Sequence, residues 1–166
     1  MPARAKSEQL RLQPATAEDE ALLLEIYAGT RAEEMLLVPW TDEQRHAFIQ
    51  MQFNAQREHY SLKYPTADHD IIYDGDVPVG RLYVARMENE IRIVDVTLLT
   101  RYRRNGLGTQ LITDLMNEAT TTRRPLRIYV ESFNPSLALF ERLGFQRTAE
   151  HGMHLLMEWM PVEAKL

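Results

Sequence analysis

The stretch "RYRRNGLGTQL", residues Arg101 to Leu111, follows an apolar run and leads into a segment with leucines at helical spacing. Its two glycines, Gly106 and Gly108, are one residue apart, and arginines precede them. The first N–H groups of a helix have no partner within the helix, and the helix dipole favours an anion at that end. Glycine also lets a ligand approach the backbone closely. The stretch therefore predicts a phosphate-binding loop, with an exposed arginine loop before an ordinary helix as the alternative.

Two familiar phosphate-binding loops do not fit this pattern. A Walker A loop has four residues between its glycines and then Lys-Ser/Thr, whereas Leu107 alone separates the glycines here and Thr109 follows them. A dinucleotide-binding fingerprint has a third glycine where this chain has Leu111, and it belongs at the start of a strand–loop–helix unit that opens the fold. A nucleotide triphosphate loop and a Rossmann loop are both excluded.

The segments around the loop predict strands and helices in the order βααβββαβαββ. Residues 10–16 alternate as a short strand does. Asp19 to Ala28 is expected to be a helix that ends at Gly29. Thr41 begins a longer helix, with Gln44 as its capping-box partner, and this helix is expected to end near position 60.

The C-terminal half continues the pattern. Asp74-Gly75 predicts the turn of a hairpin, and "NEIRIVDVTLL" (residues 89–99) is a strand apolar enough to be internal. A helix is expected from Gly106 to Ala119, and a strand over residues 126–132. Asn134-Pro135 starts a last helix, which Gly144 ends before a final pair of strands. The sheet should mix antiparallel hairpins with helical crossovers.

Length and composition indicate a single domain, residues 9–161, after a flexible N-terminus of residues 1–8. The 166 residues contain no cysteine, which excludes disulfides and thiolate chemistry. A net charge of −5 argues against a nucleic-acid partner, and no apolar run is long enough to span a membrane. A cytoplasmic protein without a bound metal is expected. Arginines nonetheless gather at 101–104 and 123–127, which suits a small polyanionic ligand.

Arg103 to Gly108, read as R-x-x-G-x-G, resembles the acetyl-CoA loop of the GNAT superfamily of N-acetyltransferases. "NPSLALFERLGF", Asn134 to Phe145, begins twenty-six residues past Gly108 and is similar to the second signature of that superfamily. The order of elements also matches, from Leu10 to the last strand. The resemblance implies an α/β (α+β) fold, with a mixed, mostly antiparallel sheet of about six or seven strands and about four flanking helices. It also implies acetyl-CoA as cosubstrate.

The resemblance assigns the cofactor-binding residues by position. The strand before the loop would offer its backbone at Val96, Thr97 and Leu98 to the pantetheine arm and the thioester carbonyl. Asn134 would approach the same arm, although capping the last helix explains this residue equally well. The pyrophosphate would be held by the loop itself, which comprises Arg103, Arg104, Asn105, Gly106, Leu107, Gly108 and Thr109.

Phe140 departs from the family pattern, in which many members carry a tyrosine that protonates the leaving thiolate. Phenylalanine has no proton to give, so water or one of Tyr60, Tyr83 and Tyr129 would supply it. A general base is also needed, because an alkylamine is almost wholly protonated at neutral pH. We favour Glu131 over Asp95, which alternation along its strand is expected to turn away from the cleft, and His59 is a candidate to relay a proton or to line the acceptor pocket.

The acceptor is expected near the long helix and the hairpin, where Trp40, Tyr60 and Tyr83 are candidate substrate-binding residues. Arg81 and Arg92 on the neighbouring strands would equally suit an acceptor that carries a carboxylate. The sequence thus predicts an N-acetyltransferase in which a primary amine, on a small molecule or a peptide, attacks acetyl-CoA directly in a ternary complex. The alternative is a non-catalytic CoA-binding or regulatory module with the same fold. Many members of the superfamily dimerise, so a homodimer is possible.

Overall fold

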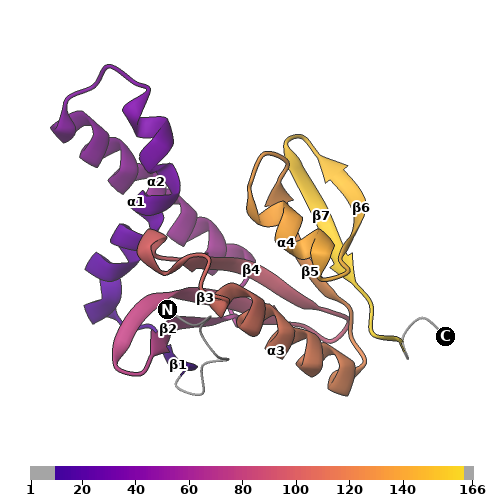
Figure 1. Cartoon of the computed structure of the whole chain (residues 1–166). Coiled ribbons are helices and arrows are strands. Elements are labelled where there is room, and N and C mark those ends of the chain that lie inside the picture. Colours follow the sequence, from indigo (N-terminus) through magenta and orange to yellow (C-terminus); the bar gives the residue numbers. More distant parts are fainter. Residues whose placement is uncertain (1–9, 163–166) are drawn as a thin grey trace.

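The computed structural model describes residues 10–162, and the N-terminal segment 1–8 that we expect to be flexible lies outside this range. Seven strands form one sheet, and four α-helices pack around it (Figure 1). The elements are β1 (Leu10–Pro14), α1 (Glu20–Leu36), α2 (Asp42–Lys63), β2 (Asp68–Asp74), β3 (Val77–Arg86), β4 (Ile91–Leu98), α3 (Leu107–Thr122), β5 (Leu126–Glu131), α4 (Ser136–Arg142), β6 (Gln146–His151) and β7 (His154–Trp159), with short 3-10 turns η1 (Ala17–Asp19) and η2 (Thr100–Tyr102).

The strand order is β1-β2-β3-β4-β5-β7-β6, and every neighbouring pair is antiparallel except β4 and β5. The parallel pair arises because α3 crosses over between the two strands, as a parallel connection requires. The predicted fold class, a mixed and mostly antiparallel sheet with about four helices, is confirmed.

Two apolar clusters lie on opposite faces of the sheet. The larger one joins the sheet to α3 and α4, and Leu111, Leu115 and Phe140 belong to it. The smaller one joins α1 and α2 to the other face, where Ile71 of β2 meets Phe53 of α2. Neighbouring strand residues point to opposite faces, which is why Ile71 and Ile72 belong to different clusters.

The prediction that α1 ends at Gly29 is wrong, because the helix continues to Leu36. A Cβ at position 29 would lie 3.5 Å from Oγ1 of Thr100, so this glycine sits against the segment that leads to the 101–111 loop. The glycine therefore marks a close approach between α1 and the loop region, and the helix formers that follow it carry the helix on. The end of α2 also lies beyond the expected position, at Lys63.

Other local predictions are confirmed. Thr41 and Gln44 form the reciprocal capping box, with N–H donors 3.2 Å and 2.9 Å from their side-chain acceptors. Gly75 takes a left-handed conformation in the β2–β3 turn, and Gly144 does so directly after α4. None of the helices within residues 10–162 is long and apolar enough to cross a membrane.

Candidate functional site

The strands β4 and β5 part from each other halfway along their length. They pair only from Ile91 to Ile93 on β4 and from Leu126 to Ile128 on β5. Beyond that point β5 pairs with β7 alone, while β4 continues to Leu98 beside β3 alone. Figure 1 shows the two halves of the sheet diverging. The sheet is thus divided at the place where an extended ligand can lie between two strands.

A β-bulge accompanies the parting. Tyr83 of β3 pairs with Asp95, but the next residue, Val84, pairs with Ile93, so Val94 has no partner across the ladder. An extra residue on one strand bends that strand and increases its twist. The bulge lies directly after the last β4 residue that pairs with β5. It therefore supplies a local reason for the change in direction of β4.

The backbone beyond the bulge presents a free edge toward the parting. The N–H of Leu99 donates to the carbonyl of Val79 at 2.8 Å, and main-chain groups of successive strand residues point to opposite sides. Thr97 therefore bonds toward β3, whereas Val96 and Leu98 turn their backbone toward the parting. In agreement, the Leu98 carbonyl accepts from Nε of Arg103 at 3.1 Å. Of the three predicted strand residues, Val96 and Leu98 offer their main chain and Thr97 does not.

The glycine loop lies at the end of this edge. Gly106 has φ 79°, a left-handed conformation that glycine adopts without strain, and α3 begins at the next residue. A Cβ at Gly106 would meet no atom of the described residues within 4 Å. Within residues 10–162 the N–H groups of Leu107, Gly108 and Thr109 have no acceptor, and the first helical bond runs from Gln110 to the Gly106 carbonyl, at 3.0 Å. The loop thus has the open backbone donors that an anion needs.

The loop arginines differ in their availability. Arg101 lies 3.6 Å from Glu25, and Arg103 bonds to the end of β4. Arg104 has φ 65°, which is unusual for a residue with a side chain, and the described part of the chain gives its guanidinium no partner. Arg104 is therefore the loop cation most available to a phosphate.

The helix α4 faces the loop from the other half of the sheet. A Cβ at Gly108 would lie 3.8 Å from Leu139, which places the start of α3 beside α4. Oδ1 of Asn134 accepts from the N–H of Ser136, the first residue of α4, at 2.8 Å, although the N-cap position itself is Pro135 and not Asn134 as predicted. The backbone N–H of Asn134 donates to the Glu131 carbonyl at 2.9 Å, whereas its side-chain Nδ2 makes no hydrogen bond within the described residues and stays available to a ligand. Phe140 is only 1% exposed and belongs to the main core.

A buried polar network lies on the opposite face of β4, under α2. Nε of Arg81 donates to Oδ2 of Asp95 at 2.8 Å, and a second guanidinium nitrogen bonds to the same oxygen. Nη2 of Arg81 also donates to Gln56 on α2, at 2.7 Å, and the Thr97 hydroxyl donates to Oδ1 of Asp95, at 2.7 Å. Arg81 is 4% exposed. Asp95 is therefore engaged at both oxygens, and Arg81 is not free to receive a substrate carboxylate.

Aromatic rings border this network. Tyr60 of α2 meets Tyr83 edge to face with ring centroids 5.4 Å apart, and Tyr83 stacks on His69 at 4.5 Å. Burial, together with the charge of Asp95, raises the pKa of Tyr60 far above its usual value. Burial and the nearby Arg81 lower the pKa of His69 to about 4. Both groups are therefore uncharged at neutral pH.

The structure brings Tyr60 and Tyr83 together but leaves Trp40 apart from them. Trp40 packs edge to face on Phe48, with centroids 5.1 Å apart, near the beginning of α2. Tyr60 lies twelve residues further along that helix, which corresponds to about 18 Å at the α-helical rise. The exposed His59 is the neighbour of Tyr60, with ring centroids 6.0 Å apart.

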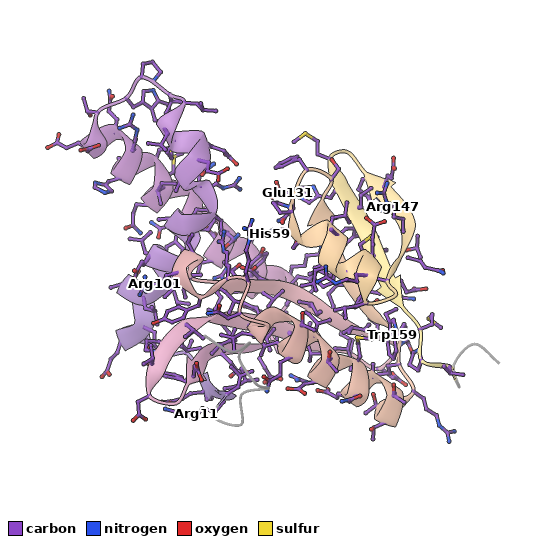
Figure 2. All side chains as sticks on the ribbon, in the orientation of Figure 1. Arg11, His59, Arg101, Glu131, Arg147 and Trp159 are labelled. Carbon is purple, nitrogen blue, oxygen red and sulfur yellow. The ribbon has the colours of Figure 1, made fainter. Side chains whose placement is uncertain are left out.

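The candidate base Glu131 lies at the end of β5. Tyr129 precedes it by two residues, so both point to the same face of the sheet. The Arg92 guanidinium lies 5.0 Å from the centre of the Tyr129 ring, and Arg92 also pairs with Glu90 at 2.8 Å. Tyr129 and Glu131 thus lie on the face of the sheet that α1 and α2 cover, but α1 and α2 cover it on the other side of the parting. Figure 2 shows Glu131 on the β5 side and His59 on the α2 side of the parting.

Sequence reasoning missed the network of Arg81, Asp95 and Gln56. The signal available was the charged residue in each of two apolar strands, "VGRLYVA" and "IVDVT". Charges in such strands are expected to pair, but the bulge shifts the strand register and hides which face each one occupies. Within residues 10–162, no three His, Asp or Glu side chains group together as they would around a metal ion.

Comparisons with known proteins agree with this fold. Residues 23–145 match the model of the acetyltransferase (GNAT) family. The PaiA N-acetyltransferase of Thermoplasma acidophilum, solved in complex with coenzyme A, has a TM-score of 0.68 at 14% identity over 91% of this chain and 98% of that one. An acetyltransferase of Thermus thermophilus has a TM-score of 0.65 at 20% sequence identity, over 93% of this chain and 98% of that one. A GNAT family acetyltransferase of Elizabethkingia anophelis, solved with acetyl-CoA bound, has a TM-score of 0.58 at 16% sequence identity, over 92% of this chain and 99% of that one. No curated protein matches the sequence.

Proposed function

The chain belongs to the acetyltransferase (GNAT) family, and on this premise we propose that it transfers an acetyl group from acetyl-CoA to a primary amine. The acceptor is a small molecule or a peptide. The observation that carries the proposal is the parting of β4 and β5 beside a helix start whose first amides find no acceptor among residues 10–162.

The cosubstrate would lie between the two halves of the sheet. The amides of Leu107, Gly108 and Thr109, with Arg104 beside them, suit a pyrophosphate because they combine unpaired donors with positive charge. The backbone of Val96 suits the amides of the pantetheine arm, since an extended chain can pair with a free strand edge. The Leu98 N–H then suits the thioester oxygen, where negative charge develops during attack.

The amine would approach from the face that carries Tyr60, Tyr83 and Glu131. These side chains lie on either side of the parting, on the face opposite α3 and α4. In the proposed reaction Glu131, directly or through water, takes the proton of the ammonium group, and His59 relays it to solvent. The nitrogen lone pair then forms a bond to the thioester carbon, the carbon–sulfur bond breaks, and the nitrogen gives up its second proton to Glu131 or water, which leaves a neutral amide. No covalent acyl-enzyme is formed.

Proton delivery to the departing thiolate falls to water or to a tyrosine other than the usual one. Phe140 occupies the position of the family tyrosine and is buried in the core. Tyr83 is on the acceptor face, and burial raises its pKa, so it keeps its proton at neutral pH. A thiol close to the pKa of cysteine is itself a fair leaving group, which reduces the need for a dedicated acid.

A non-catalytic CoA-binding module is the second candidate function. Two observations favour it: Phe140 carries no hydroxyl, and Asp95, the only carboxylate on β4, already bonds to Arg81 and Thr97. Such a module would keep the binding loop and the free edge of β4, but it would not transfer an acetyl group from acetyl-CoA to an amine.

One preparation of the full chain separates the two candidates. Calorimetry with coenzyme A measures binding, and thiol release from acetyl-CoA across a panel of amines measures transfer. The panel should include alkylamines, amino acids and short peptides. Binding together with amine-dependent thiol release supports the enzyme. Binding with no release from any amine supports the module, and the absence of binding rejects both.

A further inference from the structure

The half of β4 that presents its edge has support from one neighbouring strand only. From Asp95 to Leu98 it pairs with β3, while its other edge faces the parting. A strand end without a second neighbour is free to twist or to close toward the strand it has left. The position of its backbone therefore depends on contacts from the α2 side of the sheet and from β3.

Side chains hold this segment from the α2 side. Arg81 of β3 bonds through two of its nitrogens to Asp95 and through one of them to Gln56, so a single guanidinium ties three elements together. Thr97 bonds to the remaining oxygen of Asp95, which extends the hold two residues along β4. The planar fork of an arginine imposes direction as well as attraction. Asp95 and Thr97 flank Val96, whose backbone faces the parting.

A glycine holds the same segment from β3. Gly80 pairs with Leu98, and a Cβ at Gly80 would overlap the carbonyl oxygen of Thr97 and lie 2.9 Å from the Leu98 Cα. The two backbones therefore approach more closely than any other residue would permit. This contact and the Arg81 network act on consecutive residues of β4.

We infer that Arg81, Asp95, Gln56 and Thr97 form a brace that fixes the free edge of β4 and thereby sets the affinity for coenzyme A. Arg81 is a positioning residue, since it touches neither the expected thioester nor the acceptor and acts through Asp95. The inference rests on the proposed function for its ligand, but the brace itself is a property of the ligand-free protein.

The test compares two arginines of β3. Arg81→Lys keeps the charge but loses the fork that reaches Asp95 and Gln56 together. Arg86→Met is the matched control, because Arg86 pairs with Asp68 and Glu118 at the other end of the strand. We expect Arg81→Lys to bind coenzyme A about tenfold more weakly, since small misplacements of a binding group have effects of this order or larger. We expect Arg86→Met to lose thermal stability while binding coenzyme A as the native chain does.

Amide hydrogen exchange of the ligand-free proteins gives a second readout. The amides of Thr97 and Leu99, which bond toward β3, should exchange faster in Arg81→Lys than in the native chain or in Arg86→Met. Unchanged exchange, or faster exchange with unchanged affinity for coenzyme A, overturns the inference. If the native chain itself does not bind coenzyme A, the proposed function fails, and exchange still decides whether the brace exists.

Two further variants keep the test decisive if Arg81→Lys does not fold. Thr97→Val removes only the hydroxyl bond to Asp95, and we expect it to weaken coenzyme A binding by about twofold to threefold. Arg81→Met/Asp95→Val replaces the buried pair by apolar side chains, which is often neutral for stability. This double variant should recover the fold but not the affinity, and native affinity in it would contradict a positioning role.

Discussion

Phe140 packs edge to face against Phe145, with ring centroids 5.2 Å apart and 73° between the planes. Both rings belong to the main core. The position at which the resemblance to the family leads us to expect a catalytic tyrosine is therefore a packing position in this chain.

Phe140→Tyr tests this role. A hydroxyl added to a ring that is 1% exposed loses its contact with water and costs about 1–3 kcal/mol unless it finds an acceptor. We expect a lower melting temperature, unchanged affinity for coenzyme A and no gain in turnover. Differential scanning calorimetry and the thiol-release assay measure these quantities. Faster turnover at native stability would show instead that the para position reaches the thioester.

Gly108→Ala separates binding from stability at the loop. A Cβ at this position makes only ordinary contacts, the nearest at 3.8 Å to Leu139, and alanine is a better helix former than glycine by about 1 kcal/mol. We expect native or slightly higher stability together with weaker coenzyme A binding, because in the proposed complex the added methyl group would narrow the space between the start of α3 and Leu139 of α4. Calorimetry with coenzyme A and thermal unfolding are the measurements. Native affinity would refute the assignment of this loop.

Gly106→Ala should behave differently from Gly108→Ala. Space for a Cβ is open at Gly106, but φ is 79°, and a left-handed conformation costs an L-residue roughly 1–2 kcal/mol. We therefore expect a loss of stability as well as weaker coenzyme A binding. Urea unfolding in the absence of ligand measures the first effect. Gly106→Asn is the control, since asparagine tolerates this conformation better and should recover part of the stability.

His69 makes the fold sensitive to mild acid. Its pKa is about 4 in the folded chain and 6.5 in an unfolded one, so the unfolded state binds more protons between these values. Stability is therefore complete above about pH 6.5 and falls as the pH decreases toward 4. The loss attributable to this group is about 1–2 kcal/mol at pH 5, once solvent screening at the exposed part of the ring is allowed for. His69→Phe, which keeps an aromatic ring against Tyr83, should reduce the dependence.

The measurement for His69 is the free energy of unfolding in urea at pH 7.5 and pH 5. The native chain should lose more stability between the two values than His69→Phe does, because only the native chain must bury an imidazole without its proton. Asp95 and Asp19 oppose the effect of Arg81 on His69, but both are present in either protein. Equal losses would mean that the imidazole is protonated in the fold.

Glu131→Gln tests the proposed base. The amide keeps the size of the side chain and cannot accept a proton, so we expect turnover to fall by about 10²-fold or more while coenzyme A affinity stays native. His59→Gln should lower turnover less, since a relay from an exposed position can be replaced by water. Turnover with a fixed amine, measured across pH, checks both. Native turnover in Glu131→Gln would remove this residue from the mechanism.

Much of the chain could be predicted from the sequence because the deciding interactions are local. The Thr41–Gln44 capping box, the Asp74-Gly75 turn and the start of α3 after Gly106 each depend on hydrogen bonds between residues a few positions apart. Their residue types carry that information directly. The strand and helix order, and with it the fold class, follows from the periodicity of apolar residues.

The tertiary structure decided what depends on contacts between distant segments. Gly29 is a residue type that often ends a helix, but here it lies inside α1, at a close approach to Thr100 that the sequence does not reveal. The bulge at Val94 sends Asp95 toward Arg81 on β3, although alternation along β4 alone does not reveal that face. The local pattern of apolar residues determines which segments become strands. The pairing between strands determines where β4 and β5 part and which charged side chains meet. That pairing is a property of the whole packed sheet.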